Sequence, residues 1–233
     1  ETDGVKVTIP VLLHRLPLTT ALSGSTTENA HSETVVVPDD ATPGWGNVTV
    51  SLASTIFTDI KGGAAFLFGY PYGCLEQQIS RILPIILAED LIKSFNLTVL
   101  GDDYRQVVQT ALDGFAEYQH DSGGFGYWKK PYWPSPFVSA YAVFSLAMAK
   151  QAGYTVDADM EQKAVTYLQN VLKGQSERAT TYRYNELAWN ATDAFILYAL
   201  SLYDKYEAAY ATRLFNARGR MPVFGKTLLL KAV

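Results

Sequence analysis

The sequence predicts a mainly α-helical protein in which a short β segment precedes the helices. Apolar and polar residues alternate over residues 5–9 and 47–52, and residues 33–37 form a short β-branched run, which together predict the β segment. From about residue 55 the apolar residues recur with a helical period, which predicts the helices. Helices are expected at residues 77–95, 102–119, 136–152, 157–173, 188–216 with a break, and 222–233.

The first expected helix, residues 77–95, is apolar on almost every side, which is typical of a helix at the centre of a core. Pro84 lies inside it and predicts a kink, because proline removes a helical hydrogen bond. Asp157 is an expected N-cap of a later helix, and Gly153 and Gly174 are expected to end helices.

Two features predict that the helices repeat in pairs. Residues 141–148 and 195–202 match in apolar and small character, as equivalent helices of two hairpins would. Residues 119–128 combine a glutamine, a Gly-Gly pair and aromatic residues, which predicts a turn that fastens one hairpin to the next. This turn resembles the repeat turns of α/α-toroid proteins such as terpene cyclases and prenyltransferases. The helical part is therefore expected to be an α/α toroid of helical hairpins, present in part.

Composition excludes several classes of function. Of 233 residues, 48% are apolar, which is enough for a sizeable core, and the net charge of -4 with scattered cations gives no footprint for nucleic acid. No apolar run is long enough to predict a membrane-spanning helix. One cysteine excludes an intramolecular disulfide and a Cys-x-x-Cys metal site, and the three histidines lie far apart. We therefore expect no metal ion and no cofactor.

The single cysteine, Cys74, lies in the stretch YPYGCLEQQ, residues 70–78, and three hypotheses for it are open. Cys74 is a buried core residue, as most lone cysteines are, or a catalytic nucleophile, for which His120 is the best candidate base. The third hypothesis is a covalent bond to Gln77, because residues spaced i and i+3 lie on one face of a helical turn. In that bond the sulfur attacks the side-chain amide carbon of Gln77 and expels ammonia. The product is an electrophilic internal thioester, which must be kept dry until an amine or hydroxyl takes the acyl group.

The stretch Gly-Cys-Leu-Glu-Gln behind Tyr-Pro-Tyr resembles the thioester motif of the alpha-macroglobulin family in its bacterial form. The likeness extends over the flanking helices, the Gly-Gly-Phe-Gly-Tyr-Trp turn and the preceding β segment. The resemblance implies that residues 55–233 are a thioester domain, an α/α toroid that we expect to be truncated at its C-terminus. It also implies that residues 1–54 supply the first strands of a CUB-like β-sandwich.

The resemblance implies roles for single residues. Cys74 and Gln77 would carry the thioester, within a motif that Gly73 and Glu76 complete. Tyr70 resembles the tyrosine lid of bacterial members. The residues expected to shield the bond from water are Tyr70, Tyr72, Tyr127 and Trp128. No histidine follows His120, so transfer to an amine such as a lysine is expected rather than histidine-assisted transfer to a hydroxyl.

The function implied is that of a module in a broad-spectrum protease-trapping inhibitor, consumed once and therefore not an enzyme. Its expected partners are target proteases, through covalent acyl transfer, and the remaining macroglobulin domains of a parent chain. The expected location is extracytoplasmic: the periplasm or cell envelope of a bacterium, or otherwise secreted. Two alternatives stay open, a helical scaffold with an inert buried cysteine and a terpene-cyclase-like enzyme. The second alternative lacks a DxDD or DDxxD motif, since Asp102–Asp103 falls short of one.

Overall fold

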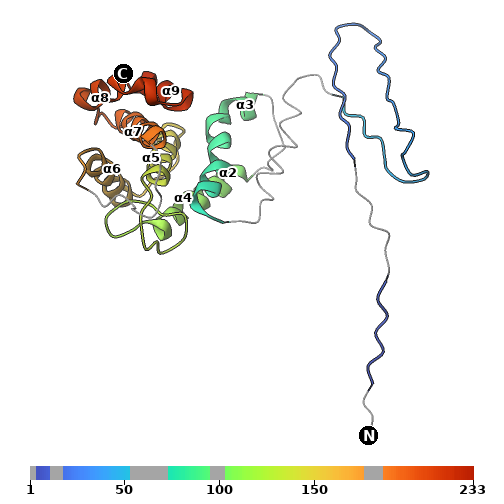
Figure 1. The fold of residues 1–233 in the computed structure, drawn as a ribbon, viewed down its shortest axis with the longest axis horizontal. Coiled ribbons are helices and arrows are strands. Elements are labelled where there is room, and N and C mark those ends of the chain that lie inside the picture. The colour runs from blue at the N-terminus through green and yellow to red at the C-terminus, as the bar shows by residue number, and fades with distance from the viewer. Residues whose placement is uncertain (1–3, 11–17, 53–72, 95–102, 176–185) are drawn as a thin grey trace. The chain divides into compact units, whose positions relative to one another are not determined.

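The computed structural model describes residues 4–10, 18–52, 73–94, 103–175 and 186–233, with the side chains of 186–188 excepted (Figure 1). Chain contacts divide the protein into two units, residues 1–54 and residues 55–233. Each unit is described by itself.

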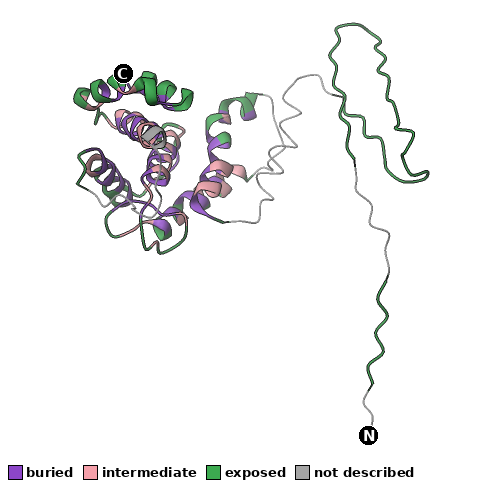
Figure 2. Cartoon of the chain, in the orientation of Figure 1, coloured by how far each residue is buried: buried purple, intermediate pink, exposed green. Residues whose placement is uncertain are grey.

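The first unit carries no β-strand in its described residues, 4–10 and 18–52, so the strands expected there are not found. Every one of these residues is exposed, and Val5, Val7 and Ile9 are 86%, 70% and 77% exposed (Figure 2). A strand needs a paired neighbour and a covered apolar face, and an isolated ribbon is at best marginally stable in water. The alternating pattern therefore has nothing to pair with inside the described part of this unit. Its assignment to a CUB-like sandwich stays a prediction.

The second unit is helical, which confirms the mainly α fold class. Its helices are α2 (Leu75–Leu87), α3 (Glu89–Ser94), α4 (Tyr104–Asp113), the 3-10 helix η3 (Gly114–Tyr118), α5 (Pro136–Gln151), α6 (Ala158–Leu172), α7 (Glu186–Ser201), α8 (Ala208–Asn216), the 3-10 helix η4 (Arg218–Arg220) and α9 (Val223–Ala232) (Figure 1). The predicted break in residues 188–216 falls between α7 and α8. The predicted helix 77–95 instead divides at Ala88, whose N–H donates to the carbonyl of Pro84 at 3.0 Å.

Four helices of this unit form a row, against which the others pack. Helices α2, α5, α7 and α9 each contact the next in that order, while α4 packs against α2, α6 against α5 and α7, and α8 against α7 and α9 (Figure 1). Phe195 of α7 joins this row, because its ring lies about 6 Å from Phe137 and Phe144 of α5 and from Phe224 of α9. The first repeated stretch lies on α5 and the second, except for its last residue, on the contacting helix α7. Closure of the row into a toroid stays a prediction.

The turn at residues 119–128 fastens α6 to the rest of the unit. The side-chain amide of Gln119 donates to the carbonyl of Met160 in α6 at 2.8 Å and to that of Gly123 at 2.9 Å. Gly123 has φ of +91°, and a Cβ on it would lie 2.4 Å from the carbonyl oxygen of Lys163. The turn therefore needs glycine both for its backbone angle and for its close approach to α6.

The predicted helix ends are also found. Asp157 caps α6 by accepting a hydrogen bond from the N–H of Met160 at 2.7 Å. Gly153 and Gly174, with φ of +79° and +71°, follow the ends of α5 and α6. No helix in the described part of the chain is long and apolar enough to cross a membrane.

Candidate functional site

Cys74 and Gln77 lie together in the first turn of α2. Cys74 is the N-cap with φ of -68° and ψ of 153°, and its carbonyl accepts from the N–H groups of Gln77 and Gln78 at 3.1 Å and 3.0 Å. Gln77 is thus the third helical residue. In the hydrogen-bonded capping box, the N-cap side chain reaches forward to the N–H of the third residue, and the third-residue side chain reaches back to the N–H of the N-cap. The same two positions here hold a thiol and a carboxamide.

The sulfur side of this pair is covered, whereas the amide side reaches a hollow. Cys74 is only 6% exposed. The Gln77 side chain lines a hollow of about 570 Å³, whose wall does not include Cys74. The side-chain oxygen of Gln77 is buried and has no hydrogen-bond partner among the described residues. Of the two residues, only Gln77 therefore lines the hollow.

The wall of the hollow comes from segments far apart in sequence. Helix α2 contributes Gln77, Gln78 and Arg81, and the end of η3 contributes Tyr118. Polar and charged side chains complete its rim: Asp103, Gln106, Thr110, Glu117 and Lys129. Lys129 pairs with Glu117 at 2.9 Å, and this ion pair raises the pKa of the Lys129 ammonium through its hydrogen bond with the carboxylate.

Hydrogen bonds hold the backbone on both sides of Cys74. The carbonyl of Gly73 accepts from the hydroxyl of Tyr118 at 2.7 Å and from the side-chain amide of Gln78 at 3.1 Å. The same Gln78 amide lies 2.5 Å from the Tyr118 hydroxyl. On the other side, the N–H of Leu75 donates to the carbonyl of Tyr127 at 2.8 Å. The turn that fastens α6 thus also fixes the start of α2.

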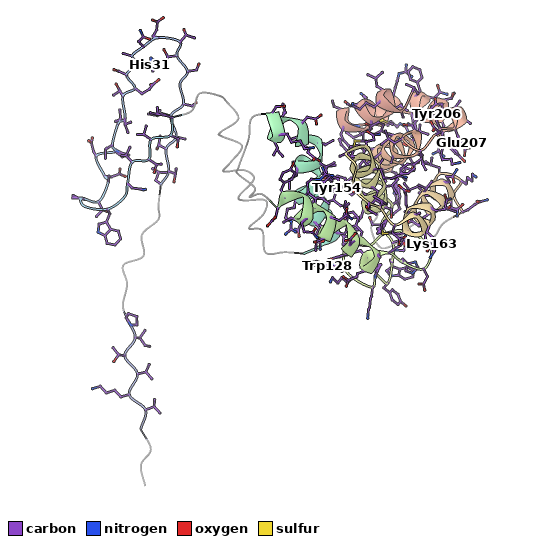
Figure 3. The ribbon with its side chains drawn as sticks, turned by 180° about the vertical axis from the view of Figure 1, so that it is seen from behind. His31, Trp128, Tyr154, Lys163, Tyr206 and Glu207 are labelled. Atoms are coloured by element: carbon purple, nitrogen blue, oxygen red, sulfur yellow. The ribbon has the colours of Figure 1, made fainter. Side chains whose placement is uncertain are left out.

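The other residues expected at the site are found in different settings. Glu76 lies in the first turn of α2, where a carboxylate is stabilised by the helix dipole. Tyr127 is partly buried against the core, while Trp128 is 63% exposed (Figure 3). Tyr70 and Tyr72 lie outside the described residues. The shielding roles of all four aromatic residues stay predictions.

His120, the candidate base of the nucleophile hypothesis, makes local contacts. Its Nδ1 lies 2.9 Å from the hydroxyl of Ser122 and accepts from the N–H of Ser122 at 3.1 Å. Both contacts stay within the turn at residues 119–128.

Sequence reasoning missed Tyr118 and Gln78. Gln78 directly follows the recognised motif and carries no pattern of its own. Tyr118 lies 40 residues beyond Gln78, and only the packing of η3 beside α2 brings the two together. Tyr118 directly precedes the turn predicted at residues 119–128, and this position was the only signal that could have pointed to it.

A family model of the A-macroglobulin TED domain matches residues 47–202. The chain belongs to the alpha-macroglobulin family. This match contains α2, the Cys74–Gln77 pair and the turn that fixes them. The resemblance drawn from Gly-Cys-Leu-Glu-Gln is thereby confirmed at the level of the family.

Bacterial relatives and solved structures agree with the family. The alpha-2-macroglobulin of Thermotoga maritima is 31% identical over 102 residues, which cover 44% of this chain and 6% of that protein. Native Escherichia coli alpha-2-macroglobulin, from domain MG7 to the C-terminus, superposes with a TM-score of 0.67 at 23% identity over 75% of this chain and 28% of the other. Salmonella alpha-2-macroglobulin reacted with methylamine superposes with a TM-score of 0.63 at 24% identity, over 72% of this chain and 11% of the other. The chain therefore spans less than a tenth of the curated relatives it matches.

Proposed function

We propose that this chain is the thioester-bearing module of a protease-trapping inhibitor, with the bond between Cys74 and Gln77. The observation that carries the proposal is the placement of these residues at the N-cap and third position of α2. At those positions the two side chains share one helical turn. Membership of the family supports an inhibitor rather than a catalytic enzyme, and the proposed module is consumed in a single reaction.

The chemistry balances without a cofactor. The Cys74 sulfur attacks the Gln77 Cδ, a C–S bond forms, and the C–N bond to the amide nitrogen breaks. The thiol proton leaves with that nitrogen as ammonia. In the second step a primary amine attacks the same carbon, an amide forms, the C–S bond breaks, and the thiol is restored. Gln77 keeps the captured amine.

The setting of the Gln77 oxygen supports the first step. A buried amide oxygen without a partner costs about 1–3 kcal/mol, and a thioester carbonyl is a weaker acceptor than an amide carbonyl. Replacing the amide by the thioester therefore relieves part of that cost. The hollow beside Gln77 supports the second step, because it leaves room for an amine next to the Gln77 side chain while Cys74 stays covered.

The Salmonella relative, solved after reaction with methylamine, supports an amine as the nucleophile. We propose that the natural amine is a lysine of the attacking protease. The proposed partners are such proteases and the remaining macroglobulin domains of a longer protein. The proposed location is outside the cytoplasm, in the periplasm or cell envelope of a bacterium. The alternative is a helical scaffold with an inert cysteine.

Intact mass spectrometry separates the proposal from that alternative. The wild-type chain is expected one ammonia lighter than its sequence mass, and methylamine is expected to add one amine and release one thiol. Cys74→Ala is expected to have the full sequence mass, to show no change of mass in methylamine and to retain its helical circular dichroism. A wild-type chain of full sequence mass whose mass does not change in methylamine would contradict the proposal.

A further inference from the structure

The residues before and after Cys74 are both tied to the segment 118–127. Gly73, before it, accepts hydrogen bonds from Tyr118 and Gln78, and Leu75, after it, donates to the carbonyl of Tyr127. The N-cap of a helix has no intrahelical bond of its own N–H, so its direction depends on contacts of this kind. We name the side chains of Tyr118 and Gln78, with the Gly73 carbonyl between them, the cysteine clamp.

The clamp is anchored in the core. Tyr118 is 2% exposed and belongs to the core cluster, so its ring has no freedom to follow a moving backbone. Its carbonyl accepts from the N–H of Gly126 at 3.0 Å, which joins η3 to the turn. Gln78, one residue past Gln77, completes the clamp from α2 itself. The clamp therefore links the fixed core to the peptide that carries the sulfur.

We propose that Tyr118 and Gln78 are positioning residues, which hold the Gly73–Cys74 peptide so that the sulfur stays covered and directed at Gln77. For its effect on the thioester this inference rests on the proposed function, whereas its effect on sulfur exposure does not. Both side chains also line the hollow beside Gln77, so the clamp is part of the wall of that hollow. Loosening the clamp opens that wall.

The variants remove single polar groups and keep side-chain volume. Tyr118→Phe removes the hydroxyl that donates to Gly73, and Gln78→Met removes the amide that donates to the same carbonyl. The matched control is Tyr141→Phe, which removes a tyrosine hydroxyl 3.2 Å from the Ser80 hydroxyl, also on α2 but beyond the motif. The control tests whether removing any tyrosine hydroxyl that contacts α2 is enough to expose the sulfur.

The first measurement is the alkylation rate of Cys74 by iodoacetamide in a Gln77→Ala background, which needs no thioester. Loss of the part-buried Tyr118 hydrogen bond predicts a rise of about fivefold for Tyr118→Phe. Loss of the exposed Gln78 hydrogen bond predicts a smaller rise for Gln78→Met, and no rise is expected for Tyr141→Phe. The second measurement, with Gln77 present, is thiol release in buffer without amine. It is expected to rise by a similar factor in the same two variants.

The outcomes are separable. Equal alkylation rates in Tyr118→Phe, Gln78→Met and Tyr141→Phe overturn the clamp, whatever the thioester does. Faster alkylation in both test variants supports it, even if the wild-type mass shows no thioester and the proposed function fails. If Tyr118→Phe loses its helical circular dichroism, Gln78→Met alone decides, because Gln78 is only partly buried.

Discussion

At the scale of single residues, the proposed bond occupies positions that other helices use for hydrogen bonds. A capping box satisfies free N–H groups at a helix start with two polar side chains. Cys74 makes no such side-chain bond, and the Gln77 side-chain oxygen is buried without a partner in the described part of the chain. The first turn of α2 therefore gives up part of its usual capping. That loss is expected where two side chains are kept for reaction with each other.

The lid proposed from the sequence gives a prediction at the same scale. Tyr70 lies four residues before Cys74, and Pro71 restricts the backbone between them. We predict that Tyr70→Gly, in the full-length protein, speeds spontaneous hydrolysis of the thioester while unfolding stays cooperative. The measurement is thiol release over time without amine or protease. Tyr72→Gly is the control and is expected to matter less, because the resemblance to the tyrosine lid of bacterial members falls on Tyr70 and not on Tyr72. Equal hydrolysis in wild type and Tyr70→Gly would leave other walls as the shield.

The placement of Cys74 and Gln77 in one helical turn could be predicted from sequence because it is local, whereas their reaction with each other stays a prediction. Cys74 and Gln77 lie three residues apart, and one helical turn is enough to bring them together. Tyr118 and Gln78 could not be predicted in the same way, because their contact depends on how η3 packs beside α2. A hydrogen bond across such a distance in sequence leaves no periodic trace.

At the scale of elements, the turn at residues 119–128 and helix α6 depend on one close approach. A Cβ at Gly123 would meet the backbone oxygen of Lys163 at 2.4 Å, and its φ of +91° already disfavours any other residue. We predict that Gly123→Ala lowers the free energy of unfolding by about 3 kcal/mol. The measurement is urea denaturation followed by circular dichroism.

Gly174→Ala is the matched control for that prediction. Gly174 has φ of +71°, and a Cβ there would have open space around it. Alanine at this position is strained only by the positive φ, so the free energy of unfolding is expected to fall by about 1 kcal/mol. Similar losses in the two variants would mean that the approach of the turn to α6 contributes nothing measurable.

Helix positions were predictable because apolar period and end signals agree along this part of the chain. Asp157, Gly153 and Gly174 mark the ends of α5 and α6 by local backbone chemistry alone. The break at Ala88 was not predicted, since apolar residues continue through it. The β pattern of residues 5–9 and 47–52 could not predict strands, because pairing depends on a partner that a single segment does not specify.

At the scale of the helical unit, one buried carboxylate joins three segments. Glu89, only 4% exposed, accepts from Lys93 in α3 at 2.8 Å and from Arg105 in α4. Arg105 also reaches the carbonyls of Ala152 and Gly153 after α5, both at 3.4 Å, and lies 4.3 Å from the centre of the Tyr154 ring. Glu89 therefore joins α3 to α4 through Arg105, and Arg105 in turn joins α4 to the end of α5.

This junction predicts how stability depends on pH. Burial raises the pKa of Glu89, but the hydrogen bonds from Lys93 and Arg105 lower it by more than burial raises it. The pKa of Glu89 therefore lies below its usual value of 4.5. A lowered pKa means that ionised Glu89 stabilises the fold above about pH 4.5, and that this contribution is lost as the pH falls through the folded pKa. We predict that the stability difference between wild type and Glu89→Gln is largest near neutral pH and shrinks below pH 4.5.

Urea denaturation from pH 7 to pH 3 measures this difference, with Asp159→Asn as the matched control. Asp159 also pairs with a lysine, Lys163 at 2.6 Å, but its side chain is 75% exposed, and water screens such pairs. Its substitution is expected to change stability little at any pH. A difference for Glu89→Gln that stays constant from pH 7 to pH 3 would show that the junction depends on the shape of the side chain rather than its charge. If the difference shrinks at low pH for Glu89→Gln but not for Asp159→Asn, the stabilisation comes from the charge of the buried Glu89 carboxylate and not from an exposed ion pair.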